Sequence, residues 1–181
     1  MLFLTLVQDA VQKDKIIFIY QNHYSRMAYT AGKYLYSRED VEDAVQESML
    51  KLLTVIDRIE VEDPVRLKNL CCVVARNVAV NMAKSKKQNV LPLEEVFDTA
   101  DRSTKTPEET AVENDLMSRL ISCIDSMSDI YRDVCRLKYI NELKESEIAR
   151  LLDLPPKTVN QRIFRGKQIL KNILMKENVN A

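Results

Sequence analysis

Apolar residues recur every three to four positions along most of this chain. Runs with this spacing cover residues 41–56, 67–87 and 156–170, and a further run follows residue 128. Such a period is typical of amphipathic helices, whereas strands alternate at every second position. Only two glycines and five prolines interrupt 181 residues, a composition that favours helix throughout. The sequence therefore predicts an all-α protein.

The helical period lapses once for a long stretch, between about residues 86 and 106, where polar and acidic residues replace it. So long a segment without regular structure is uncommon inside a compact domain. We therefore predict two small helical domains, residues 1–87 and 106–176, joined by a flexible acidic linker at 88–105. Thr106, Pro107 and Glu109 form a capping-box pattern at the start of the second domain.

Residues 145–166, ESEIARLLDLPPKTVNQRIFRG, have the pattern of two short helices folded against each other, a helix-turn-helix. Pro156 suits the first position of the second helix, because a proline there has no backbone N–H to leave unpaired. Asp153 occupies a turn position where glycine is common. Apolar Val159 and Ile163 recur on one side of the second helix, with Gly166 in the same stripe to permit close contact.

The side chains opposite that stripe are types that read bases or hold phosphates. A hairpin that served only a core would not need such a face, so DNA recognition is the better interpretation. The predicted contacts are Lys157, Thr158, Asn160, Gln161, Arg162, Phe164, Arg165 and Gln168.

The charge is balanced overall but is arranged in blocks. Residues 39–63 hold nine acids against two bases, residues 66–87 hold six bases and no acid, and residues 136–176 hold ten bases against four acids. Two basic surfaces separated by acidic segments suggest two contacts with a polyanion, while the acidic parts face something else. The alternative is that the charges merely solvate helix faces.

The acidic helix predicted at 41–56 has a core stripe that includes Val45, Met49 and Leu52. On the opposite side lie Asp43, Gln46, Glu47 and Leu50. A carboxylate pair with an amide and an exposed leucine suits a protein partner better than DNA, because acids repel phosphates. The plain alternative is a solvated helix face.

The basic segment at 66–87 presents side chains suited to phosphate contacts. A basic helix without aromatic residues has low specificity when taken alone. The predicted contacts are Arg66, Lys68, Arg76, Asn77, Asn81, Lys84, Lys86 and Lys87.

Taken together, these segments resemble the bacterial RNA polymerase sigma factors of the two-domain, extracytoplasmic-function type. SREDVEDAVQESMLKLL is similar to the family's second conserved region, VVARNVAVNMAKSKK to its helix for the minus-ten element, and MSDIYRDVCRLKYINELKESEIARLLDLPPKTVNQRIFRGKQIL to its fourth region. The resemblance implies that Asp43, Gln46, Glu47 and Leu50 bind the polymerase clamp helices. It also implies that residues 59–66 capture a flipped base, and that the final helix reads the minus-thirty-five element.

The expected function is that of a sigma factor, which binds core RNA polymerase through the largest-subunit clamp helices and the flap and directs initiation at promoter DNA. The resemblance leaves open an anti-sigma factor as a further partner. We expect a cytoplasmic protein that is not an enzyme and has no metal or cofactor, since four cysteines and one histidine show no ligand spacing. We expect the cysteines to be small buried residues. The competing hypothesis is a free-standing helix-turn-helix regulator that binds an operator without polymerase.

Overall fold

The computed structural model describes residue 7 and residues 9–87 and 115–179, and the regular structure in these ranges is entirely helical. The all-α prediction is confirmed for this part of the chain. The predicted linker at 88–105 and the capping box at 106–109 lie outside the described residues. The helices are α1 (Ala10–Gly32), α2 (Arg38–Leu53), α3 (Pro64–Lys87), α4 (Asp115–Asp125), α5 (Asp129–Cys135), α6 (Glu145–Leu152) and α7 (Pro156–Val179).

Short polar side chains begin each of the first three helices. Asp9 accepts a hydrogen bond from the N–H of Val11 at 2.8 Å, and Ser37 accepts one from the N–H of Asp40 at 3.0 Å. Asp63 does the same for the first turn of α3. These caps satisfy backbone donors that a helix start leaves unpaired. The three helices then pack on one another around a core of fully buried side chains, including Ile16, Ile19, Met27, Met49, Leu52 and Val74.

The C-terminal half contains α4 to α7 and a π-helical turn, Arg136–Ile140, that continues α5. Its own apolar cluster includes Ile124, Cys135, Ile140 and Leu170. The apolar run after residue 128 predicts one helix with Ile130, Val134 and Leu137 inward, and for Ile130 this prediction is wrong, because Ile130 is 46% exposed whereas Val134 and Leu137 are buried. Ile130 lies in the first turn of α5, where the neighbouring helices do not cover it.

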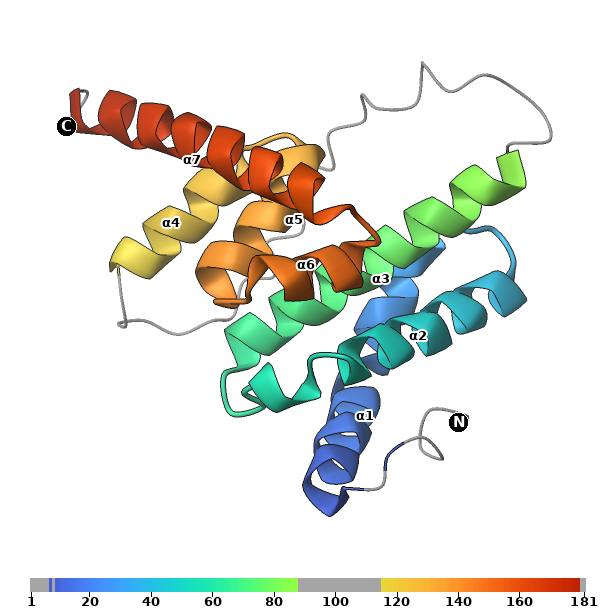
Figure 1. The fold of residues 1–181 in the computed structure, drawn as a ribbon. Helices are drawn as coiled ribbons and strands as arrows, with labels where there is room; N and C mark the ends of the chain where they lie inside the picture. The colour runs from blue at the N-terminus through green and yellow to red at the C-terminus, as the bar shows by residue number, and fades with distance from the viewer. Residues whose placement is uncertain (1–6, 8, 88–114, 180–181) are drawn as a thin grey trace.

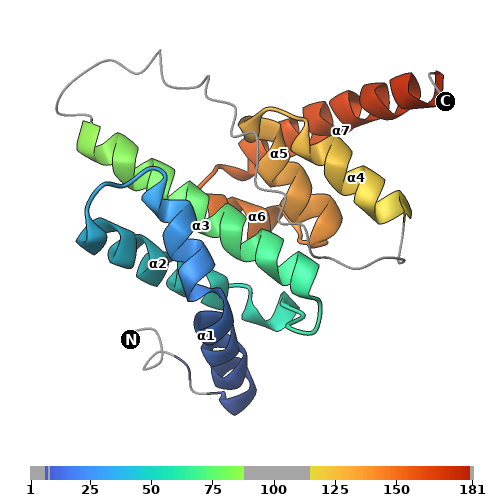
Figure 2. The same cartoon turned by 180° about the vertical axis from the view of Figure 1, so that it is seen from behind.

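The two halves pack against each other, with α3 between α1 and α2 on one side and α5 and α6 on the other (Figure 1, Figure 2). A continuous apolar core joins Leu67 and Leu70 of α3 to Leu143 and Leu151 of the C-terminal half. α7 projects beyond this body toward the C-terminus. Within the described ranges, no helix has both the length and the apolar character that crossing a membrane requires.

Candidate polymerase and nucleic-acid interfaces

The outer face of α2 brings together the four residues predicted to bind polymerase. Their spacing of three and four places them on one side of the helix, away from buried Val45 and Met49. Asp43, Gln46 and Glu47 are exposed, and Leu50 keeps 36% of its surface accessible. The face is thus acidic, with one accessible apolar side chain, and is available to a partner.

The turn between α6 and α7 is fixed by local backbone chemistry. The Glu147 carboxylate accepts the backbone N–H of Lys144 at 2.7 Å and caps α6. Asp153 ends that helix in the left-handed region, with φ 52° and ψ 43°, which short polar side chains tolerate better than most. α7 begins at Pro156 as predicted, and the carbonyl of Pro155 accepts the N–H groups of Thr158 and Val159.

This turn presents one face of α7 to solvent. Six of the eight predicted readout residues are exposed, and Thr158 and Arg162 are partly buried. Phe164 is 65% exposed, which is unusual for a large apolar side chain. The six are Lys157, Asn160, Gln161, Phe164, Arg165 and Gln168.

Gly166 explains how closely α7 approaches α5. A Cβ atom at Gly166 would lie 2.4 Å from the Sγ atom of Cys135, far inside van der Waals contact. The predicted role of this glycine in close helix packing is therefore confirmed. Val159 and Leu170 are buried on the same side, so the polar face must point outward.

The basic residues predicted on α3 do not form one free surface. Asn81 and Lys86 are exposed, whereas Arg66, Lys68, Arg76, Asn77 and Lys84 are partly buried; the side chain of Lys87 lies outside the described part of the structure. Lys86 turns toward α2 and pairs with Asp40. Its hydrogen bond, with a second one from Ser37, lowers the pKa of the Asp40 carboxyl.

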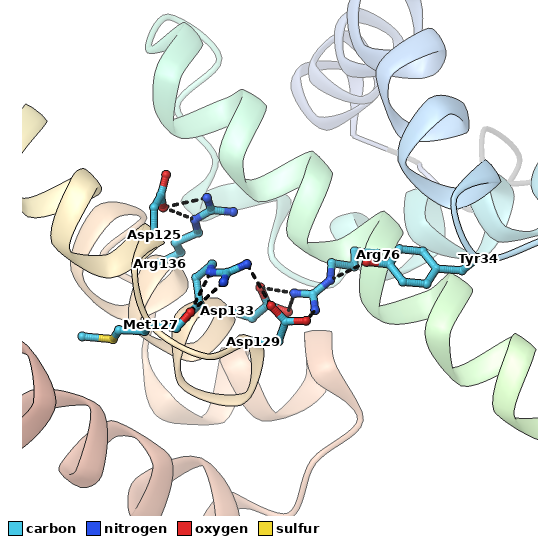
Figure 3. A network of polar contacts seen from close by, with 8 residues as sticks. Tyr34, Arg76, Asp125, Met127, Asp129, Asp133 and Arg136 are labelled. Atoms are coloured by element: carbon cyan, nitrogen blue, oxygen red, sulfur yellow. Dashed lines mark hydrogen bonds and ion pairs between the residues drawn. The ribbon is translucent and has the colours of Figure 1, made fainter. Parts of the chain in front are cut away.

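Arg76 lies at the centre of a network that joins α3 to α5 (Figure 3). Its Nη1 donates to both carboxylate oxygens of Asp133, at 2.9 and 3.0 Å, and its Nη2 pairs with Asp129. Its Nε donates to the hydroxyl of Tyr34, just after α1, at 3.0 Å. Burial raises the pKa of the Asp133 carboxyl, and the positive charges of Arg76 and Arg136 oppose that shift.

Arg66 also bonds across the two halves. Its Nη2 lies 3.0 Å from the Glu142 carboxylate, and its carbonyl accepts the Asn141 side-chain amide at 2.8 Å. Asn141 and Glu142 help to line a cavity of about 200 Å³ together with residues of the segment 59–66, whose last three residues form the first turn of α3. The segment expected to capture a base therefore faces the C-terminal half.

Sequence reasoning missed the acids that make these contacts, because it assigned the C-terminal half a basic surface only. Glu142 and Asp153 are two of the four acids in the mainly basic segment 136–176. Both have positive φ, 54° and 52°. Asp153 pairs with Lys51 of α2.

No group of His, Cys, Asp or Glu side chains suited to a metal ion occurs among the described residues. The four cysteines are free thiols, and the prediction that they are buried holds for Cys71, Cys123 and Cys135, while Cys72 is partly exposed. Burial raises the pKa of the Cys135 thiol to about 11. A thiol with so high a pKa is a packing residue rather than a reactive one.

Two family models match the two halves. Residues 19–89 match sigma-70 region 2, and residues 117–170 match sigma-70 region 4. The ECF RNA polymerase sigma factor SigW of Bacillus subtilis is 27% identical over 167 residues, covering 88% of this chain and 87% of that protein. The ECF RNA polymerase sigma-E factor of Haemophilus influenzae is 25% identical over 175 residues, covering 92% of each.

The solved structure of CnrH in complex with the cytosolic domain of CnrY is also similar to this chain. It has 17% sequence identity and a TM-score of 0.36, and the match covers 89% of this chain and 88% of that chain.

Proposed function

Because this chain belongs to the sigma-70 family, as a sigma factor of the extracytoplasmic-function type, we propose that the exposed face of α2 docks on the clamp helices of core RNA polymerase. The protein is a sigma factor that directs promoter-specific transcription initiation. A free-standing regulator is not favoured, since it would have no use for region 2. The observation that carries the proposal is that Asp43, Gln46, Glu47 and Leu50 share one accessible face of α2, opposite the buried Val45, Met49 and Leu52.

Retention of core polymerase on immobilised protein tests this face. Gln46→Ala combined with Glu47→Lys removes a hydrogen-bonding group and reverses a charge without touching the core. We expect retention to fall by about tenfold or more, as for central residues of other interfaces. Asp14→Lys with Gln21→Ala is the matched control, because both residues are exposed on α1, away from this face. Equal retention by the two double variants would contradict the proposal.

The exposed face of α7 is proposed to read the minus-thirty-five element. Arg165 has the chemistry for a bidentate contact with guanine, and losing one such contact costs about 1–3 kcal/mol. In transcription from promoters with intact and scrambled upstream elements, Arg165→Ala should shrink the difference between the two. Lys167→Ala, on the exposed flank of the same helix, should weaken both promoters alike, because a phosphate contact carries no base information. An unmutated protein that transcribes both promoters equally would exclude α7 as the readout helix.

The remaining assignments follow from the same proposal. Residues 1–87 form the region 2 domain, residues 106–176 the region 4 domain, and 88–105 the linker between them. The eight polar residues of α3 and the loop at 59–66 receive the melted minus-ten strand, which requires capture of unstacked bases and no catalytic residue. The protein acts in the cytoplasm with polymerase, without a metal or cofactor, and the polymerase flap is the expected partner of region 4. An anti-sigma factor remains a predicted partner.

A further inference from the structure

The segment proposed to capture a base begins where a short turn ends. After α2 the chain forms a 3₁₀-helical turn, Ile56–Arg58, and Ile59 leaves it with an extended backbone, at φ −81° and ψ 121°. Ile59 is buried, and its N–H donates to the carbonyl of Ile56 at 3.1 Å. The carbonyl of Ile59 lies beyond the end of the turn, so it needs a donor from another element.

Lys15 of α1 supplies that donor. Its Nζ donates to the carbonyl oxygen of Ile59 at 2.8 Å, from 44 residues earlier in the chain. On the same side of α1, the Nε2 of Gln12 donates to the Asp57 carboxylate at 2.9 Å. Figure 1 and Figure 2 show the first turns of α1 next to the segment that joins α2 to α3. α1 therefore holds the turn and the residue after it at two points.

The far end of the capture segment is fixed separately. Asp63 caps α3 by accepting two N–H groups of its first turn, at 3.1 and 2.9 Å. Between the two ends, Glu60 and Glu62 are exposed. The path of these middle residues therefore depends on where Lys15 and Asp63 hold the ends.

Of the two contacts from α1, the bond from Lys15 contributes the larger share. Both bonds have one charged partner, but the Lys15 bond is partly buried, whereas the Gln12 bond is exposed. Water competes less for a bond that is partly buried. Lys15 also lines the cavity that the capture segment shares with Leu70. A shift of the Ile59 carbonyl would therefore change the wall of that cavity.

We propose that Lys15 is a positioning residue for promoter opening, which holds the start of the capture segment in the conformation that receives the unpaired base. The inference rests on the proposed function of residues 59–66. A segment that is already ordered loses less conformational entropy when it binds, so a segment without this bond binds the base more weakly. Because Lys15 acts through the Ile59 carbonyl, its effect is specific to the captured base.

Binding of a forked promoter DNA to core polymerase loaded with the full chain tests the proposal. The DNA is taken from a promoter located by sequencing the transcript starts that the protein produces, and its non-template strand is unpaired across the minus-ten element. An abasic site replaces each minus-ten base in turn. For the unmutated protein, we expect one position at which the abasic site weakens binding by about tenfold, a loss typical of one bound base.

Lys15→Met keeps the aliphatic part of the side chain but removes the donor. At the captured position, the loss caused by the abasic site should fall from about tenfold to about twofold, because the two changes remove the same interaction. Lys13→Met is the matched control, since it removes the same charge from an exposed residue on the same turn of α1 and should keep the tenfold loss. Lys15→Arg keeps a charged donor and should restore a loss of about fivefold or more. General destabilisation would weaken binding to every DNA alike and leave these ratios unchanged.

Equal abasic losses for Lys15→Met and Lys13→Met would overturn the inference. If Lys15→Met does not fold, Gln12→Ala removes the second contact from α1 and should reduce the loss to about fivefold. An undiminished loss with Gln12→Ala would then overturn the inference as well. A different result tests the proposed function itself: if the unmutated protein tolerates an abasic site at every minus-ten position, the segment captures no base.

Discussion

The two basic helices α3 and α7 make an instructive pair. Each has 24 residues and begins with a proline, and each was predicted to touch DNA. α7 packs one side on α4, α5 and α6 and leaves its polar face in solvent. α3 packs against α1 and α2 and also meets α6 and the π-helical turn, so its basic side chains find partners inside the protein.

The difference shows that one basic helix can keep its polar face in solvent while another uses its basic side chains for contacts inside the protein. Arg165 on α7 is exposed, whereas Arg76 on α3 is held by three side chains. The chemistry of the two side chains is the same. What separates them is the supply of carboxylates from another part of the chain.

Arginine-to-alanine substitutions in α3 and α7 should differ in their effect on the free energy of unfolding. Arg76→Ala leaves the nearly buried Asp133 without its main partner, which we expect to cost about 2 kcal/mol of unfolding free energy. Arg165→Ala removes an exposed side chain and should change that free energy by no more than about 0.5 kcal/mol. Urea unfolding followed by circular dichroism measures both.

Arg76→Lys is the control for this pair of substitutions, because it keeps the charge but loses the fork that serves three partners at once. We expect Arg76→Lys to lower the free energy of unfolding by less than Arg76→Ala does. If Arg76→Ala were as mild as Arg165→Ala, the network around Arg76 would not hold the halves together.

The two glycines of the chain offer a second comparison. Gly166→Ala places a methyl group 2.4 Å from the Sγ atom of Cys135, which is fully buried, so the gain in helix propensity should be outweighed and the chain destabilised by about 1–2 kcal/mol. Gly32→Ala meets nothing closer than a Val41 methyl at 4.0 Å and should be neutral or stabilising. Thermal unfolding of both variants gives the comparison.

Cys135→Ala removes the atom with which the new methyl collides. Combined with Gly166→Ala, it should destabilise the protein by less than the sum of the two single changes, because neighbouring sites that share one space are not additive. Strict additivity would mean that α7 moves away from α5 instead of being restrained by that contact.

Much of the fold could be predicted from the apolar period, because the period of each helix indicates which side faces its own core. The outer face of α2, the start of α7 at Pro156 and the turn at Asp153 all follow from short-range chemistry, and the structure has them where the sequence placed them. The role of Gly166 in close packing was predicted for the same reason, since one buried stripe passes through it.

Contacts between the halves could not be predicted in this way. Val73 lies seven residues, or two turns, from Arg66 on the same side of α3, and it is 1% exposed although that side was assigned to DNA. The apolar period of α3 does not indicate that acidic side chains of the C-terminal half cover this side of the helix. The π-helical turn at Arg136–Ile140 was missed too, because buried Val134, Leu137 and Ile140 recur every three residues, as they would on an ordinary helix.

The smallest expected effect is the coupling free energy of an exposed ion pair between the two halves, compared with that of a buried pair. Glu142 is 65% exposed in its pair with Arg66, whereas Asp133 is 15% exposed in its pair with Arg76. A double-mutant cycle on Arg66 and Glu142 should give a coupling of about 0.5 kcal/mol in 0.1 M salt. In 1 M salt, where the Debye length falls to about 3 Å, that coupling should approach zero. The cycle on Arg76 and Asp133 should change less, because solvent ions screen a buried pair poorly. Equal losses in the two cycles would mean that the Arg76 network is open to solvent.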